Sequence, residues 1–373
     1  MKKIFYVFAA AALCAACSQN VETPVPANQT ADDAIGFSAY TSTAVTRGEV
    51  IKTADFESAG IGVFAFYQPA ANGTAQDFNT YKFSMPDFMY NQKVTYTDSK
   101  WSYSPVKYWP NNTYDQVSFF AYAPYEDNKA WEDMGVKTDV NATKLTMSFP
   151  IYAEVTAQKD YLFADPVLNQ TKQTVTGNIS FPFNHITSQV NLQVGVETDA
   201  ANSTPGEWKD ANTVIEVQSI TFKGLSDALN YEYTIATSTG NTTVATTKQD
   251  ITLTAADNFN GDAATINTTN YPADTEWKDL NNANSVLFLA PEALGDVTIV
   301  YTVTTEDSSN GQNSSTITNT ITKSLSSLTL EAGKAYNLQF LIGMTSVKIT
   351  SNITDWTNAG NTPVDVPANT TEP

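Results

Sequence analysis

The chain has 373 residues, of which 39 are Asp or Glu and 20 are Lys or Arg, so its formal net charge is −19. A charge of this sign repels nucleic acid and anionic membrane surfaces, which argues against both as partners. The length is sufficient for two domains of ordinary size, and the 18 Tyr and 19 Phe, together with many Thr and Val, favour strands over helices.

Residues 1–16 have the layout of a secretory signal peptide, because Lys2 and Lys3 precede an apolar run of about fifteen residues that ends in small residues. We expect this leader to be removed. The apolar run of the leader is shorter than the roughly 20 residues that a membrane-spanning helix needs. Cys14 and Cys17 are the two cysteines of the chain, so no internal disulfide is expected in the mature protein. The residues that end at Cys17 resemble a bacterial lipobox, which predicts a lipid on its thiol. The alternative is ordinary cleavage that leaves an unmodified thiol.

Residues 17–47 are predicted to form a tether followed by a strand. The tether, up to about residue 33, is rich in proline and polar residues and has no periodic apolar pattern. Residues 35–45 then alternate with period two, which is typical of a half-buried strand. This strand ends at Arg47 and Gly48.

Further alternating segments predict an all-β fold of two tandem antiparallel β-sandwich domains, over residues 48–172 and 173–373. The boundary is placed in the polar stretch 168–178, which contains a turn glycine. The segments 237–247 and 306–315, rich in Asn, Thr and Ser, are predicted to be surface loops. The predicted strands of the two domains lie at 61–67, 117–123 and 145–149, and at 190–196, 214–222, 286–290, 297–303, 335–344 and 346–353.

The sequence offers little support for catalysis. His185 is the one histidine, so any imidazole-based site depends on it, and no G-x-S-x-G motif is present. We interpret His185 as a structural residue. The mature chain lacks the cysteines of a zinc site beyond Cys17, and no segment has the ligand spacing of a calcium loop. We therefore expect no enzymatic activity, no metal and no cofactor.

The aromatic run between Trp101 and Asn112 has two interpretations. Exposed rings stack on the apolar face of a sugar, which would suit a carbohydrate-binding outer-membrane surface lipoprotein. Buried rings would instead contribute to packing, which is the more usual place for large aromatic side chains.

Arg47 is the single arginine, since the other 19 basic residues are lysines. An arginine-specific protease would therefore have one cleavage site, and cleavage before Gly48 would detach the lipid, the tether and the preceding strand. Loss of that strand would expose backbone groups and an apolar groove, which an extended segment of another chain could fill. The alternative is that Arg47 is merely an exposed residue.

The chain resembles the fimbrillin-like subunits of type V pili from Bacteroidales over nearly all of its mature length. The resemblance depends on the order and spacing of several segments. These are the lipobox leader, IGFSAYTSTAVTRG at 35–48, GIGVFAFY at 60–67, WSYSPVKYWPNNTYDQVSFFAYAPY at 101–125, ISFPFNHITSQVNLQV at 179–194 and GKAYNLQFLIGMTSVKITSNITDW at 333–356.

The resemblance implies transthyretin-like sandwiches, transport to the outer membrane as a lipoprotein, proteolytic removal of the N-terminal strand, and joining of neighbouring subunits by strand donation. The implied partners are other fimbrial subunits, an arginine-specific protease and a host protein or glycan receptor, and the final location is an extracellular fimbrium. A stalk, an anchor or a tip role all remain open.

In this family the donor strand comes from the C-terminal region, which here is 346–368. Two segments of it carry an alternating apolar pattern, and the choice between them is open. The candidate donor residues are Val347, Ile349 and Ile353 in the first segment, and Val364 and Val366 in the second.

Overall fold

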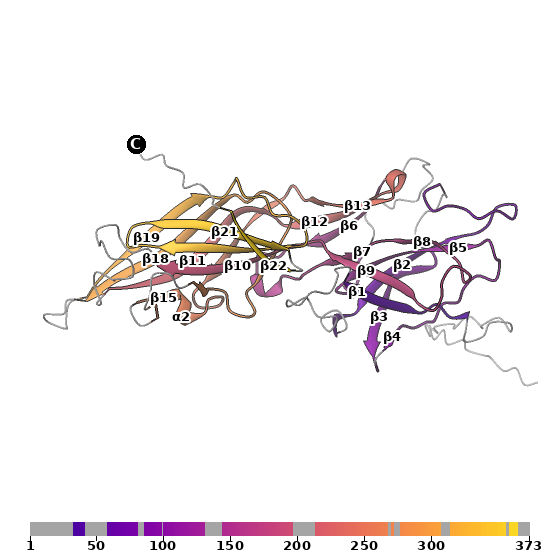
Figure 1. Ribbon diagram of the computed structural model, residues 1–373, viewed down its shortest axis with the longest axis horizontal. Coiled ribbons are helices and arrows are strands. Elements are labelled where there is room, and N and C mark those ends of the chain that lie inside the picture. Colours follow the sequence, from indigo (N-terminus) through magenta and orange to yellow (C-terminus); the bar gives the residue numbers. More distant parts are fainter. Residues whose placement is uncertain are drawn as a thin grey trace, which may run out of the picture.

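The computed structural model describes residues 33–41, 58–80, 86–98, 100–130, 144–196, 213–267, 270–271, 277–306, 314–355 and 358–364. These residues form an elongated molecule in which the N-terminal half and the C-terminal half lie at opposite ends (Figure 1). Almost all regular structure is β, and the α-helix α2 (Gly261–Ala264) is a single turn.

The N-terminal half is built on an eight-stranded sheet. Its order is β1 (Phe37–Thr41), β9 (Ile179–His185), β7 (Leu162–Ala164), β5 (Gln116–Ala123), β2 (Ile61–Gln68), β3 (Met89–Thr97) and β4 (Lys100–Ser102), with β8 (Val167–Gln170) also paired to β5.

The central strands of this sheet are buried on both faces, which explains their nearly continuous apolar sequence. In β2, Ile61, Val63 and Ala65 belong to one apolar cluster, whereas Phe64 and Phe66 belong to another. The first cluster also contains Phe37 of β1 and Trp109 of the segment that follows β4. The second faces a separate three-stranded sheet.

That three-stranded sheet joins the two halves of the chain. Its order is β13 (Thr239–Val244), β12 (Ala228–Thr234) and β6 (Lys144–Pro150). The hairpin β12–β13 comes from the C-terminal half of the sequence, yet its Tyr231 ring stacks on Phe163 of β7, with centroids 3.7 Å apart. The N-terminal core is therefore completed by a distant hairpin.

Two sheets form the C-terminal sandwich. One has the order β14 (Lys248–Thr254), β11 (Thr213–Ser226), β18 (Asp296–Glu306) and β19 (Ser314–Ser324), with β15 (Thr265–Ile266) beside β11. The other has the order β16 (Lys278–Asp279), β10 (Ser188–Val196), β20 (Lys334–Ile342), β21 (Val347–Asp355) and β22 (Asn358–Val364), with β17 (Leu287–Leu289) beside β10.

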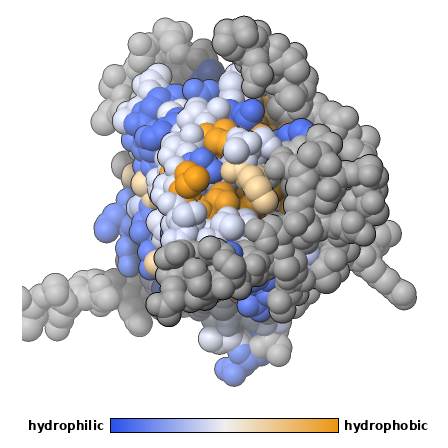
Figure 2. Space-filling view, turned by 90° about the vertical axis from the view of Figure 1, so that its left-hand side faces the viewer, coloured by the Kyte–Doolittle hydropathy of each residue, from blue (hydrophilic) through white to orange (hydrophobic). Residues whose placement is uncertain are grey.

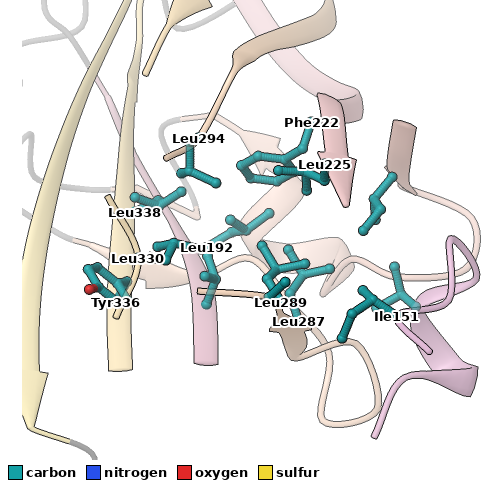
Figure 3. Close-up of a cluster of buried hydrophobic side chains, with 14 of the residues drawn as sticks. Ile151, Leu192, Phe222, Leu225, Leu287, Leu289, Leu294, Leu330, Tyr336 and Leu338 are labelled. Carbon is teal, nitrogen blue, oxygen red and sulfur yellow. The ribbon is translucent and has the colours of Figure 1, made fainter. Parts of the chain in front are cut away.

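Side chains from both sheets meet in the core of this sandwich. Figure 3 shows Phe222 and Leu225 of β11 directed toward the same interior as Leu192 of β10 and Leu338 of β20, and all four are buried. Figure 2 faces the far end of this half and shows apolar residues gathered there within a polar border. No described helix is long and apolar enough to cross a membrane.

The prediction of an all-β fold with two tandem β-sandwiches is confirmed, and the segments predicted as strands from residue 61 onward overlap strands, whereas residues 42–45 of the strand predicted at 35–45 lie outside the described residues. Most strand pairs are antiparallel, but β1–β9 and β10–β20 are parallel. Each parallel pair joins strands far apart in sequence, where no tight turn imposes an antiparallel arrangement. The predicted loop at 237–247 is wrong in its middle, because the threonines there pair with β12 and form β13.

The division of the chain at residue 172 remains a prediction, and sheet pairing crosses it in two places. Strand β9 lies after residue 172 but pairs with β1 and β7 in the N-terminal sheet. Strand β12 also lies after it and pairs with β6 along seven positions. Long-range strand pairing, rather than the polar stretch 168–178, decides which sheet these segments join.

Candidate functional site

The segment 33–41 lies between two neighbours in the N-terminal sandwich. On one side β1 runs parallel to β9, with Phe37 opposite Ile179. On the other side the Ile35 N–H donates to the Lys107 carbonyl oxygen at 2.9 Å, and the Trp109 N–H donates to the Asp33 carbonyl oxygen at 2.9 Å. The segment thus fills a slot between β9 and residues 107–109.

Two buried side chains, at alternate positions along the segment, hold it in this slot. Ile35 and Phe37 are each 2% exposed, and Tyr40 on the opposite face is 48% exposed. The Phe37 ring centroid lies 5.1 Å from that of Tyr103, 5.5 Å from that of Phe181 and 6.0 Å from that of Phe119. An aromatic pocket therefore receives one large side chain of the strand.

Tyr103 also contacts the backbone of the segment. Its hydroxyl donates to the Ile35 carbonyl oxygen at 2.8 Å. Burial raises the pKa of Tyr103 to about 12, although a hydrogen bond with the Lys107 backbone lowers it. An ion pair between Lys172 and Asp33 holds the beginning of the segment. Removing β1 would leave this aromatic pocket and the facing edge of β9 open, and we call the resulting space the β1 groove.

The β1 groove is lined by residues from segments far apart in sequence. They come from β9, β5 and the loop that contains the aromatic run: Phe181 and Ile179 from the first, Phe119 from the second, and Tyr103 and Trp109 from the third.

Several residues predicted from the sequence to be functional lie outside the described residues. These are Cys17, Arg47, Gly48 and Val366, so their lipidation, processing and donor roles stay predictions. Thr41 is the last residue described before Arg47.

The first candidate donor segment forms β21 of the C-terminal sandwich. Val347 and Ile349 are buried there, and Ile353 is half-buried against the same core. Strand β21 pairs with β20 along nine positions and with β22 on its other side. Its apolar side chains therefore already have partners within their own subunit.

The second candidate donor segment begins in β22, which ends at Val364. Strand β22 is the last strand in its sheet and pairs with β21 at four positions. Releasing β22 breaks fewer pairs than releasing β21, because β21 lies between two neighbours.

The aromatic run at 101–112 contributes to packing. Trp109 is buried with its ring edge-on to Phe119, at 6.1 Å between centroids, and Tyr103 covers Phe37. These two rings are therefore absent from any sugar-stacking surface. The sequence pattern located the run but gave no indication that it lines the β1 groove.

His185 is buried at the end of β9, and its Nδ1 lies 2.9 Å from Oδ2 of Asp160. The Thr187 hydroxyl donates to Oδ1 of the same carboxylate at 2.8 Å. This arrangement fits a structural role at the connection between β9 and β10. Among the described residues, no group of three or more His, Cys, Asp and Glu is placed to hold a metal ion.

Comparison with known proteins shows the same architecture in a fimbrial protein. Residues 43–356 match the model of a family described as fimbrillin-like. A curated relative, fimbrium subunit Fim1C of Phocaeicola vulgatus, is 27% identical over 94% of this chain and 96% of its own length. The crystal structure of a fimbrial protein from Bacteroides vulgatus superposes with a TM-score of 0.62 at 21% identity, covering 87% of this chain and 99% of that one.

Proposed function

The chain belongs to the fimbrillin-like family, and from this premise we propose that it is a structural subunit of a cell-surface fimbria, assembled by proteolysis after Arg47 and by donor-strand exchange. The relative Fim1C is named as a fimbrium subunit. The observation that carries the proposal is the segment 33–41, which contains the end strand β1 and in which Ile35 and Phe37 are each 2% exposed.

The proposed pathway begins at the cell surface. The signal peptide is removed, Cys17 carries the lipid, and the protein reaches the outer membrane. An arginine-specific protease then cuts between Arg47 and Gly48, which detaches both the anchor and β1. The open β1 groove offers the aromatic pocket and the unpaired edge of β9 to another subunit.

For the donor we favour the segment from β22 onward, which contains Val364 and Val366, over β21. Donation of β21 would remove Val347 and Ile349 from their own core, at a cost of about 1.5–3 kcal/mol for each side chain exposed. Release of β22, the last strand of its sheet, leaves Val347 and Ile349 in place. Pro363 and Pro367 lack N–H groups, so the donor would forgo two backbone hydrogen bonds.

The cleavage step is tested by N-terminal sequencing of fimbriae sheared from cells. The mature subunit should begin at Gly48, and an Arg47→Ala variant should accumulate on the cell with its lipid and remain unassembled. If the Arg47→Ala variant assembles normally, or if sheared subunits retain residues 17–47, the proteolytic step is excluded.

The groove is tested with protein cut by an arginine-specific protease and separated from the 17–47 fragment in mild denaturant. Three synthetic peptides are compared, covering 33–45, 346–355 and 358–371. The first is the positive control, because it restores β1. We expect the third to raise the melting temperature by about 5 °C or more at saturation, and the second to raise it less. Restoration by the first peptide alone would overturn the donor assignment and leave the groove intact.

The proposal includes a receptor-binding, adhesive role for the assembled subunit, with a host protein or a glycan as the receptor. The carbohydrate-binding alternative is weakened by the burial of Trp109. Intact binding of purified fimbriae to cells after treatment with glycan-removing enzymes would favour a protein receptor, whereas its loss would favour a glycan.

A further inference from the structure

Strand β19 is an edge strand without the usual protection against pairing. It pairs with β18 over its full 11 residues, and no described strand pairs with its other edge. Natural edge strands are commonly blunted by charged residues, proline or short length. Strand β19 contains no proline, no acidic residue and one lysine, Lys323, next to its end. Strand β14 at the opposite edge of the same sheet carries Lys248 and Asp250.

The outer face of β19 is exposed and regular. Thr318 and Thr320 lie on this face and are exposed, whereas Ile317 lies on the opposite face with Asn319 and is 62% exposed. Thr316 and Thr322 make hydroxyl contacts with threonines of β18 at 2.9 Å and 3.0 Å, and this face of β19 carries no charged side chain. Asn319 points the other way, because its amide donates to the Met344 carbonyl oxygen.

The sequence of β19 reads the same in both directions around Asn319. Residues 316–322 are Thr-Ile-Thr-Asn-Thr-Ile-Thr, and Ser314 and Ser324 extend the symmetry. Two such strands can pair antiparallel about a twofold axis through Asn319. Isoleucine then lies opposite isoleucine and threonine opposite threonine, which are favourable cross-strand neighbours.

Charge also favours a second copy as the occupant of this edge. The chain carries a net charge of −19, so most of its surface repels an identical molecule, but β19 has no carboxylate. In the symmetric register Lys323 faces Ser315 of the second copy, so no like charges are opposed. Two strands of this length form on the order of ten backbone hydrogen bonds, as many as a typical protein interface has.

We propose that β19 is the contact of a twofold dimer, in which β19 of a second copy pairs antiparallel with Asn319 opposite Asn319. The four-stranded path β14-β11-β18-β19 then continues into that of the second copy. The contact is separate from the β1 groove in the N-terminal half and from β22. If the chain assembles as proposed above, the same contact joins two fimbriae side by side.

Charge exchange tests the proposed register in the unassembled full chain, with Cys14→Ser and Cys17→Ser so that no native thiol remains. Thr318→Lys/Thr320→Lys and Thr318→Glu/Thr320→Glu each place like charges opposite one another across the axis. Analytical ultracentrifugation should show a concentration-dependent dimer for the parent chain, weakened about tenfold or more in either variant. An equimolar mixture of the two variants should regain the dimer as a heterodimer, and circular dichroism should show unchanged folding.

Disulfide formation tests whether the twofold axis passes through Asn319. In the same cysteine-free background, Asn319→Cys places two sulfur atoms across the axis within reach of a disulfide, whereas Thr322→Cys places them about 20 Å apart along the strands. Oxidation should cross-link the first variant and leave the second monomeric.

Three results would overturn the proposal. One is a monomeric parent chain with no Asn319→Cys cross-link. Another is equal cross-linking of the Asn319→Cys and Thr322→Cys variants. The third is dimerisation that appears only after residues 365–373 are deleted, because the C-terminal tail would then be the occupant of the β19 edge. None of these outcomes depends on Arg47 or on donor-strand exchange, so each leaves the proposed function untouched.

Discussion

Replacement of Phe37 by alanine measures how firmly β1 is held in its groove. Phe37 is 2% exposed and its ring contacts Tyr103, Phe119 and Phe181. Truncation of a buried phenylalanine to alanine costs about 3–5 kcal/mol, and the aromatic contacts contribute to that value. Because β1 is at the end of its sheet, the cost can appear as local detachment of β1 rather than as global unfolding.

Native-state hydrogen exchange of the uncleaved chain is the appropriate assay. The amide of Ile35 donates to Lys107 and the amide of Ile179 donates to Gly36, so both report on detachment of this segment. If the free energy of detaching β1 falls by about 3 kcal/mol, exchange of these two amides becomes about a hundredfold faster. The exchange rates of amides in the central pair β2–β5 should change much less, since their exchange does not depend on detachment of β1.

Tyr40→Ala is the matched control, because Tyr40 lies on the same strand but is 48% exposed. This substitution should change the free energy of detaching β1 by no more than about 0.5 kcal/mol. Equal exchange rates at Ile35 and Ile179 in the Phe37→Ala and Tyr40→Ala variants would refute the reasoning, since the aromatic pocket would then contribute nothing to holding β1.

Three other substitutions test the core and its charges. In Gly62→Ala, the added methyl group would lie 2.1 Å from the Tyr122 ring, so we expect a loss of about 1–3 kcal/mol in the free energy of unfolding, measured by urea titration. Tyr231→Ala removes the stack on Phe163 and should cost about 3–5 kcal/mol, with both halves destabilised when followed by hydrogen exchange. Burial raises the pKa of Glu126, but hydrogen bonds from Lys129 and Lys159 outweigh it, and the net pKa lies below the usual 4.5. A lowered folded-state pKa stabilises above the unfolded-state value, and this stabilisation is lost as the pH falls through the folded-state pKa. Glu126→Gln should therefore lower the free energy of unfolding at pH 7 by about 1 kcal/mol, because solvent screens this half-buried group, and the difference from the parent chain should shrink in urea titrations below pH 4.5.

Two apolar patterns were a reliable guide to the strands of this chain: continuous apolar runs at 61–67 and 117–123, and period-two alternation at 335–344. Alternation failed where side chains on both faces are polar. The threonines of β13 and β19 gave no contrast between a buried and an exposed face, so the first was predicted as a loop and the second was not predicted. Pairing with β12 and β18 stabilises these strands instead of an apolar face.

The candidate site, too, was predicted from the sequence only in part. A removable strand before Arg47 was predicted from its alternation and from the unique arginine, and β1 lies in that segment. The residues that receive it were not predicted, because Tyr103, Phe119 and Phe181 are far apart in sequence and each had an equally good explanation as ordinary core.

The sequence by itself determined that this is an all-β protein with a single arginine at 47 and an uncharged, symmetric stretch around Asn319, and it predicts a leader that ends near Cys17. These properties are local, so they can be read from neighbouring residues. The tertiary structure alone decided that β1 runs parallel to β9, that the hairpin β12–β13 completes the N-terminal core, and that β19 ends its sheet. Each of these depends on which strands meet after the chain has closed long loops, and the local side-chain pattern that makes a strand does not specify its partner.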